Sequence, residues 1–187
     1  MAQYMTFRFA KRLDACNEGY DMVAKALGGD SAYGMNKPIP LSAILEHAGI
    51  KNTFWCLRRL ALDPLQQRDL RLFAADCAEH VLPCFEGRHP NDKRPREAIQ
   101  AAKDFANGIL SRGQLKIAAD AAYAAANAAN AANAADAAYA AAYAANAANA
   151  AYAAYAADAE RQYQTEKLME ILIKWESDQM KEGANKS

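Results

Sequence analysis

Ala118–Ala159 reads AADAAYAAANAANAANAADAAYAAAYAANAANAAYAAYAADA, and this alanine-rich tract decides the class of fold. Thirteen residues interrupt the alanines, each three positions after the last except at two gaps of four. Alanine has the highest helix propensity of all residues, so we predict that the tract is helical. The interrupting residues are Asp120, Tyr123, Asn127, Asn130, Asn133, Asp136, Tyr139, Tyr143, Asn146, Asn149, Tyr152, Tyr155 and Asp158.

The spacing of these residues bears on how the tract is arranged. Three positions rotate a side chain by about −60° around an α-helix, so the interrupting residues spiral and form no single stripe. One continuous helix would be about 63 Å long, whereas a compact chain of this length is about 40 Å across. The unit Asp120-Ala-Ala-Tyr123 recurs sixteen residues later as Asp136-Ala-Ala-Tyr139. We therefore predict two or three short helices packed in a bundle, with one long helix as the alternative.

The rest of the chain also carries helix signals and lacks the alternation that is typical of strands. Phe7–Leu27 is predicted to form one helix that ends at Gly28. Gly49 suits the left-handed position that ends a helix, and Asn52 is predicted to cap the next one. Other helix ends are marked by Asp63-Pro64 and Pro95 as starts, Asn107-Gly108 as an end, and Ser111 with Gln114 as a capping box.

Two further patterns complete the predicted helices. Pro83 is expected to kink or end its helix, because proline lacks the backbone donor and clashes with the preceding turn. A closing helix is indicated by an apolar face at Leu168, Ile171, Leu172 and Trp175. We expect one continuous all-α domain, a helical bundle with closely packed alanine-rich C-terminal helices. Its parts are an N-terminal helical part at 1–110, the alanine-rich repeat with the closing helix at 111–180, and a flexible tail at 181–187.

Charge and composition limit the classes of partner that we expect. The chain has 22 basic and 22 acidic residues, and the tract has neither lysine nor arginine, so we expect no nucleic acid polymer as partner. Asparagines and aspartates at regular intervals would be unsatisfied in lipid, which excludes a membrane-spanning tract and gives no reason to expect a membrane partner. Four cysteines without paired spacing, and no secretory signal, predict a cytoplasmic protein with reduced thiols: Cys16, Cys56, Cys77 and Cys84.

One candidate metal site deserves a test. Cys77, His80 and Cys84 lie at i, i+3 and i+7, so two thiols and an imidazole share one helix face, and Cys56 or His89 could add a fourth zinc ligand. Because a proline disturbs the helix between them and buried cysteines usually pack as small apolar residues, we predict no metal. The sequence has no glycine-rich phosphate loop, nucleophile elbow or metalloprotease helix, so we predict neither a cofactor nor an enzyme.

The densest mixture of charges lies between Arg68 and Arg96. It can be a structural network that ties the Asp92–Pro95 turn to the preceding helix, or an arginine clamp for an anionic nucleotide or carboxylate. In the tract, tyrosines can form a core, or tyrosines and asparagines can line a groove for a planar ligand. The candidate ligand- or partner-binding residues are Arg68, Arg71, Arg94, Arg96, Tyr123, Tyr139, Tyr143, Asn130 and Asn146.

Three segments carry a resemblance: RDLRLFAADCAEHVLP at Arg68–Pro83, RPREAI at Arg94–Ile99 and ANG at Ala106–Gly108, all before an alanine repeat. The pattern is similar to that of alanine-rich proteins encoded by bacteriophages and bacteria, many of which are described as immunity proteins. Cys16–Tyr20 and Phe54-Trp55 also resemble the N-terminal part of the phage members. Where this family usually carries Arg and Trp in the repeat, this chain has Asn, Tyr and Asp. The resemblance implies an accessory protein that neutralises a toxin, a host defence component or a signal, and it implies no reaction.

We therefore expect a non-enzymatic inhibitor or immunity-type binding protein, encoded by a phage and acting in the bacterial cytoplasm, that occludes a host or toxin protein. Two alternatives stay open. The chain can sequester a small nucleotide-like signalling molecule between tyrosines and arginines, or it can form a homo-oligomeric structural protein whose alanine faces meet across a symmetry axis. A cavity lined by Tyr and Arg would favour sequestration, and an exposed Tyr/Asn face would favour a protein partner.

Overall fold

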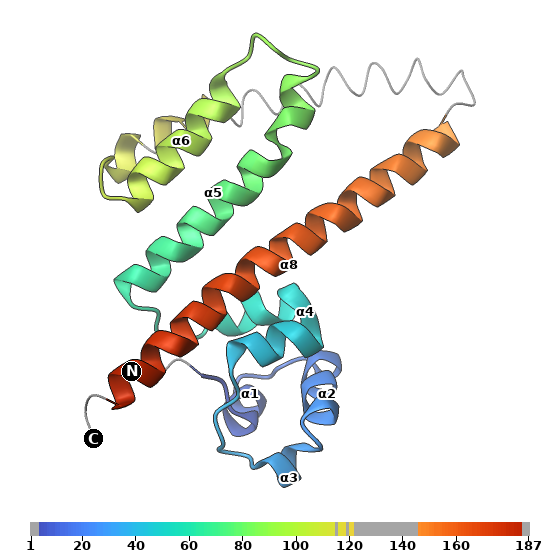
Figure 1. Ribbon diagram of the computed structural model, residues 1–187, viewed down its shortest axis with the longest axis vertical. Coiled ribbons are helices and arrows are strands. Elements are labelled where there is room, and N and C mark those ends of the chain that lie inside the picture. The colour runs from blue at the N-terminus through green and yellow to red at the C-terminus, as the bar shows by residue number, and fades with distance from the viewer. Residues whose placement is uncertain (1–3, 115, 119, 122–145, 185–187) are drawn as a thin grey trace. The chain divides into compact units, whose positions relative to one another are not determined.

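The computed structural model describes residues 4–114, 116–118, 120–121 and 146–184. Within these ranges every regular element is a helix (Figure 1), which confirms the all-α prediction. The one β contact among them is an isolated bridge, in which Met5 and Ile39 exchange backbone hydrogen bonds of 3.3 and 2.8 Å. No helix in this part of the chain has both the length and the apolar character needed to span a membrane.

The chain divides into two compact units. The first unit joins Met1–Gln66 to Gln164–Ser187, and the second unit is Gln67–Tyr163. Both α5 and α8 run from one unit into the other. The predicted boundaries at 110 and 180 differ from this division and stay a prediction. The helices are α1 (Phe7–Arg12), α2 (Asn17–Ala26), α3 (Asp30–Tyr33), α4 (Leu41–Leu57), α5 (Pro64–Glu86), α6 (Arg94–Ala106) and α8 (Asn146–Ala184).

The predicted single helix at Phe7–Leu27 is wrong, because a turn separates α1 from α2. Asp14 adopts a left-handed φ of 51°, which aspartate tolerates better than most residues. The amide of Ala15 donates to the carbonyl of Ala10 at 3.1 Å, and the amide of Asp14 donates to that of Lys11 at 3.2 Å. These two bonds are those of a Schellman motif, which ends α1 at Arg12 with Leu13 as the C-cap.

The predicted break at Gly49 is confirmed, since this residue has φ 77° and ψ 174° inside α4. Only glycine adopts this backbone conformation readily. The predicted cap at Asn52 is wrong: its side-chain amide donates 2.7 Å to the carbonyl of Ala48, and the hydroxyl of Thr53 donates 3.1 Å to the carbonyl of Gly49. Both side chains therefore bond to carbonyls at the break.

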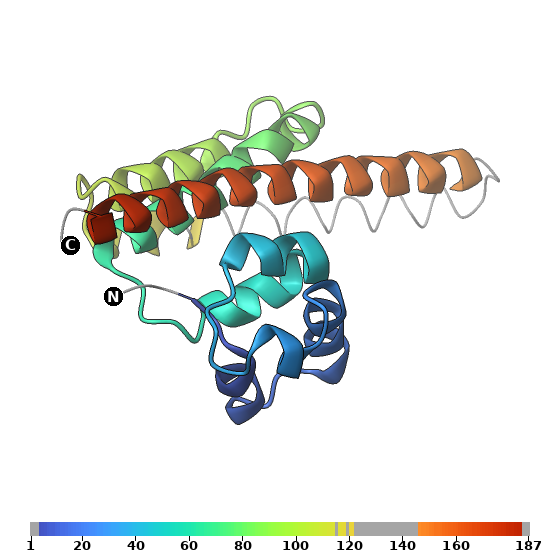
Figure 2. The same cartoon turned by 60° about the horizontal axis from the view of Figure 1, so that its bottom comes forward.

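Large apolar side chains fill the core of the first unit, in which α1, α2, α3 and α4 gather together (Figure 2). The largest fully buried ones are Met5, Phe7, Ile39, Leu45, Leu168 and Leu172. α8 also supplies a polar anchor to this unit. The carboxylate of Glu176 accepts 3.0 Å from the backbone amide and 2.7 Å from the hydroxyl of Ser42, so it caps the start of α4.

The start of α5 and the end of α6 lie where the sequence predicts them, whereas α5 does not end at Pro83. α5 starts at Pro64, and Asp63 and Gln66 form a reciprocal capping box with bonds of 2.9 and 3.1 Å. The helix continues past Pro83 to Glu86. α6 ends at Ala106, followed by the predicted Asn107-Gly108 cap with a φ of 75° at the glycine. The predicted box of Ser111 and Gln114 is present as well, with bonds of 3.0 and 3.4 Å.

α8 joins the end of the alanine tract to the closing helix in one helix of 39 residues. Asn146–Ala159 is therefore not a separate short helix. The arrangement of 122–145 lies outside the described residues, so the choice between short helices and one long helix stays open there. α8 also extends to Ala184, into the segment that the sequence assigns to a flexible tail.

Candidate functional site

α5 and α6 lie side by side in the second unit (Figure 1). Ion pairs connect the two helices. The ammonium of Lys103 lies 2.6 Å from the Glu79 carboxylate, and the guanidinium of Arg96 donates two bonds of 2.7 and 2.6 Å to Glu86. Glu86 is seven residues after Glu79, and Arg96 is seven residues before Lys103. This matched step shows an antiparallel pair of helices with complementary charged faces, and Lys103 also reaches Asp76 at 3.1 Å.

The electrostatics of this pair follow from these contacts. The hydrogen bond from Lys103 holds the pKa of Glu79 below its ordinary value, and the bond from Arg96 does the same for Glu86. In return, the bonds to these carboxylates raise the pKa of Lys103 and of Arg96. All four groups remain accessible to water, so each pair adds little stability. Their main effect is to hold charged side chains in fixed positions on the surface.

The four predicted arginines divide between the two ends of α6. Arg68 and Arg71 of α5 contact residues at its C-terminal end, and Arg94 and Arg96 lie at its N-terminal end. At its C-terminal end, Arg68 donates bonds of 3.1 and 2.8 Å to the side-chain oxygen of Asn107, and the guanidinium of Arg71 lies 5.3 Å from the centre of the Phe105 ring. Arg96 lies eleven residues before Asn107, which is about 16 Å along a helix. Arg68 and Arg71 therefore do not converge with Arg96 on one point.

Arg94 is held locally at the N-terminal end of α6. Its guanidinium donates bonds of 2.8 and 2.6 Å to Asp92, whose pKa this bond lowers. Together these contacts match the interpretation of the cluster as a structural network, since each of the four arginines has a partner within the second unit. Sequence reasoning missed Lys103, although its spacing of seven from Arg96 on α6 matches that of the acidic residues on α5.

The tyrosine and asparagine candidates cannot be placed. Tyr123, Tyr139, Tyr143 and Asn130 lie outside the described residues, and Asn146 is described only as the first residue of α8. Their role as core or as binding face stays a prediction.

His80 and Cys77, two of the candidate metal ligands, contact residues that do not form a metal site. His80 lies 2.6 Å from the Glu160 carboxylate through Nδ1, and its ring stacks on Tyr163 with centroids 3.8 Å apart and planes 4° from parallel. Cys77 is half-buried, and burial raises the pKa of its thiol. Among the residues that the structure places, no group of three or more His, Cys, Asp or Glu side chains could hold a metal ion. His80 instead links α5 to α8.

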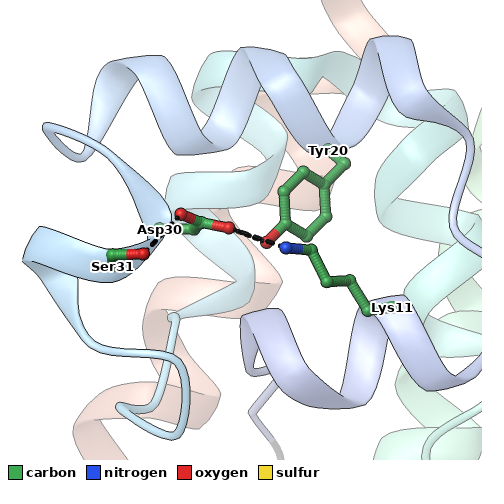
Figure 3. A network of polar contacts seen from close by, with 4 residues as sticks. All are labelled: Lys11, Tyr20, Asp30 and Ser31. Carbon is green, nitrogen blue, oxygen red and sulfur yellow. Dashed lines mark hydrogen bonds and ion pairs between the residues drawn. The ribbon is translucent and has the colours of Figure 1, made fainter.

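A second polar network, which sequence reasoning missed, connects three helices of the first unit (Figure 3). One carboxylate oxygen of Asp30 accepts 2.6 Å from the hydroxyl of Tyr20 and 2.9 Å from the ammonium of Lys11, while its other oxygen accepts 3.2 Å from Ser31. The bonds from Tyr20 and Lys11 hold the pKa of Asp30 far below its ordinary value. Burial and the bond to Asp30 raise the pKa of Tyr20. Lys11 and Tyr20 lie 19 and 10 residues before Asp30, too far in sequence for a local pattern to reveal the network.

The first unit also holds an apolar cavity of about 40 Å³. Val23, Ile44 and Trp55 line it, with the Cys16 thiol donating 3.5 Å to the side-chain oxygen of Asn52 at one wall. Ligand pockets for molecules of nucleotide size measure roughly 300 Å³ or more. This cavity is a gap in packing and is too small for the nucleotide-like ligand considered from the sequence.

Comparison with known proteins gives one result. A family model described as Imm-5 like putative immunity protein matches residues 60–182, which is more than half of the chain. No curated protein and no solved structure matches. The matched stretch contains α5, α6 and nearly all of α8, and it excludes α1, α2, α3 and α4.

Proposed function

Because the chain belongs to the family of Imm-5 like immunity proteins, we propose that it is a non-enzymatic binding protein that neutralises a partner protein by covering it. The observation that carries this proposal is the extent of the match, which includes both helices of the ion-paired α5–α6 face. We propose that this face takes part in contact with the partner.

The geometry of the α5–α6 face suits this role. Arg96 and Lys103 are held by carboxylates, yet the side chain of Arg96 remains 53% exposed and that of Glu79 49% exposed. Side chains that are already fixed lose less entropy on binding, which favours affinity. Alternating positive and negative groups select a partner of complementary pattern and disfavour others.

The finer parts of the proposal concern setting and target. We place the protein in a bacterial cytoplasm as a phage accessory protein, and its target is a toxin or a component of host defence. The resemblance of Arg68–Pro83 to phage and bacterial proteins supports this setting. Occlusion needs no chemical step, so the mechanism requires only that the partner's working surface be covered.

A rescue assay tests the proposal. Bacteria that express one member of a panel of toxins and defence effectors are grown with and without the chain, and survival is counted. We expect one member to be neutralised, and the purified pair to co-elute in size-exclusion chromatography with light scattering. A charge-reversed variant, Arg96→Glu with Lys103→Glu, should lose both rescue and complex. Rescue without a complex would contradict occlusion.

A further inference from the structure

The exposed face of α1 carries three cations. Phe7 and Ala10 point into the core of the first unit, whereas Arg8, Lys11 and Arg12 are exposed. Positions i, i+3 and i+4 share one face of a helix, so these cations lie together. α1 lies outside the stretch that matches the immunity family, so nothing about that family accounts for this face.

Cations of the first unit rest on aromatic rings. Four such contacts occur between residues 9 and 59. Their distances to the ring centre range from 3.8 to 5.0 Å. Arginines and aromatic rings are enriched in protein interfaces, where they carry much of the binding energy. The pairs are Lys11 with Tyr20, Arg12 with Phe9, Lys37 with Tyr33, and Arg59 with Trp55.

Two of these pairs, Arg12 with Phe9 on α1 and Lys37 with Tyr33, lie on neighbouring segments. The backbone amide of Arg8 donates 2.9 Å to the carbonyl of Met35, and the rings of Phe7 and Tyr33 have centroids 6.0 Å apart. These contacts bring the segment that bears Lys37 against α1. We call this surface the basic–aromatic patch, and it consists of Arg8, Phe9, Arg12, Tyr33 and Lys37.

The basic–aromatic patch keeps its positive charge. Within the described residues, no carboxylate lies within 4.0 Å of the charged groups of Arg8, Arg12 or Lys37. The neighbouring Lys11 differs, because Asp30 neutralises it at 2.9 Å. Three cations therefore remain available for a partner in a chain whose formal net charge is zero.

We propose that the basic–aromatic patch docks an acidic segment of a partner protein. Three free cations match a short run of Asp or Glu side chains, and the rings of Phe9 and Tyr33 add apolar contact beside them. A nucleic acid fits less well, because nucleic-acid affinity rests on neutralising a row of phosphates, about 6–10 in a typical complex. The surface lies outside the family match, so this inference goes beyond the proposed neutralisation and stands apart from its target.

The full chain and a fluorescein-labelled oligoglutamate peptide provide the test, with fluorescence anisotropy at low and at high salt as the readout. The patch variant combines Arg8→Gln, Arg12→Gln and Lys37→Gln. We expect the wild-type chain to bind the peptide and to lose it at high salt. The patch variant should bind about tenfold more weakly, since three exposed charge contacts together reach about that effect.

A matched control removes three exposed cations elsewhere, through Lys25→Gln, Arg88→Gln and Arg112→Gln. It changes the net charge equally and should bind the peptide like the wild type. Circular dichroism and thermal melts confirm that both variants fold. Amide NMR spectra of the wild-type chain should show peptide-induced shifts at residues 8–12 and 33–37.

Several results would overturn the proposal. An equal loss in both variants would show an effect of net charge alone, and no binding by the wild type would leave the patch without the proposed partner. Tighter binding of an oligothymidylate of equal charge would assign the patch to nucleic acid. None of these results depends on whether the chain neutralises a toxin.

Discussion

Two surfaces of this protein, the α5–α6 face and the basic–aromatic patch, use cations differently. On the α5–α6 face, Lys103 and Arg96 are paired with carboxylates across the helices. In the first unit, Arg12 and Lys37 lie over aromatic rings instead. A carboxylate neutralises the cation that it orients, whereas a ring supports the cation and leaves its charge in place. The residues that sequence density marks as a binding cluster are thus largely matched within the fold, and the free cations lie elsewhere.

The two units also differ in the sizes of the side chains that they bury. Phe7, Leu168 and Leu172 are among the large side chains that fill the first unit. The buried residues of α5 and α6 include the small Ala75 and Ala101 beside the larger Phe73 and Leu82. Alanines bury little apolar area and let helices approach closely. We therefore expect substitutions in the core of the first unit to cost more stability than substitutions in the surface pairs of α5 and α6.

The strongest test of this difference is Leu172→Ala. Leu172 is 1% exposed, and removing a buried leucine side chain costs about 3 kcal/mol in free energy of unfolding. Ile173→Ala is the control. Ile173 is the next residue and is 54% exposed, so its replacement should change stability little. Both tryptophans, Trp55 and Trp175, belong to the first unit, so urea titration followed by tryptophan fluorescence reports on that unit. Equal losses in the two variants would contradict the assigned core.

A backbone test comes next. Gly49→Ala places a side chain at φ 77° and ψ 174°, a conformation that costs a non-glycine residue about 1–3 kcal/mol. Gly113→Ala is the matched change in the second unit, at a helical position where the nearest atom to a new Cβ is 4.0 Å away. We expect Gly49→Ala to lower the urea midpoint and Gly113→Ala to leave it unchanged or raise it. A neutral Gly49→Ala would mean that the break in α4 is not required.

Local signals explain which parts of the fold the sequence predicts. Asp63-Pro64, Asn107-Gly108 and Ser111 with Gln114 each satisfy backbone groups within a few residues, so their composition alone marks helix ends. The break at Gly49 is of the same kind. The turn at Asp14 was not predicted, because helical apolar spacing continues across it. Aspartate is also a weaker signal than glycine for a left-handed residue.

Long-range contacts explain what the sequence does not predict. Glu176 caps α4 through Ser42, 134 residues earlier, and no local pattern joins the two. The antiparallel match of Lys103 with Glu79 needs the register of two helices before it can be recognised. Density of charge marks the stretch between Arg68 and Arg96, but it cannot tell a charge that is neutralised in the fold from one that is free.

A direct comparison of one paired and one ring-supported cation sharpens this point. Lys103 lies 2.6 Å from Glu79 and 3.1 Å from Asp76, so Lys103→Gln leaves two carboxylates without their partner. For such a partly exposed group we expect a loss of up to about 1 kcal/mol at low salt, which fades at high salt. Lys37→Gln removes only the contact with the Tyr33 ring, so it should cost less and should respond less to salt. Chemical denaturation of both variants measures this, and equal effects would remove the distinction between the units.

The smallest expected effect is a dependence on acid. The pKa values of Glu79 and Glu86 lie below the ordinary value of 4.5 in the folded chain, because Lys103 and Arg96 bond to their ionised forms. Below pH 4.5 the unfolded chain therefore binds more protons than the folded chain. The stability that these pairs provide is fully present above pH 4.5 and is lost as the pH falls through the folded pKa values.

The variant Glu79→Gln with Glu86→Gln isolates this contribution. Near neutral pH it should be slightly less stable than the wild type, and the two curves of unfolding free energy should meet as the pH falls through the folded pKa values of these two carboxyls. Glu97→Gln is the control, since this exposed glutamate of α6 makes no ion pair within the described residues. Far-UV circular dichroism with urea at each pH gives the curves. If the stability curves of the double variant and the wild type stayed parallel at acidic pH, the ion pairs between α5 and α6 would orient side chains without stabilising the helices. The contrast between the two surfaces would then rest on charge alone.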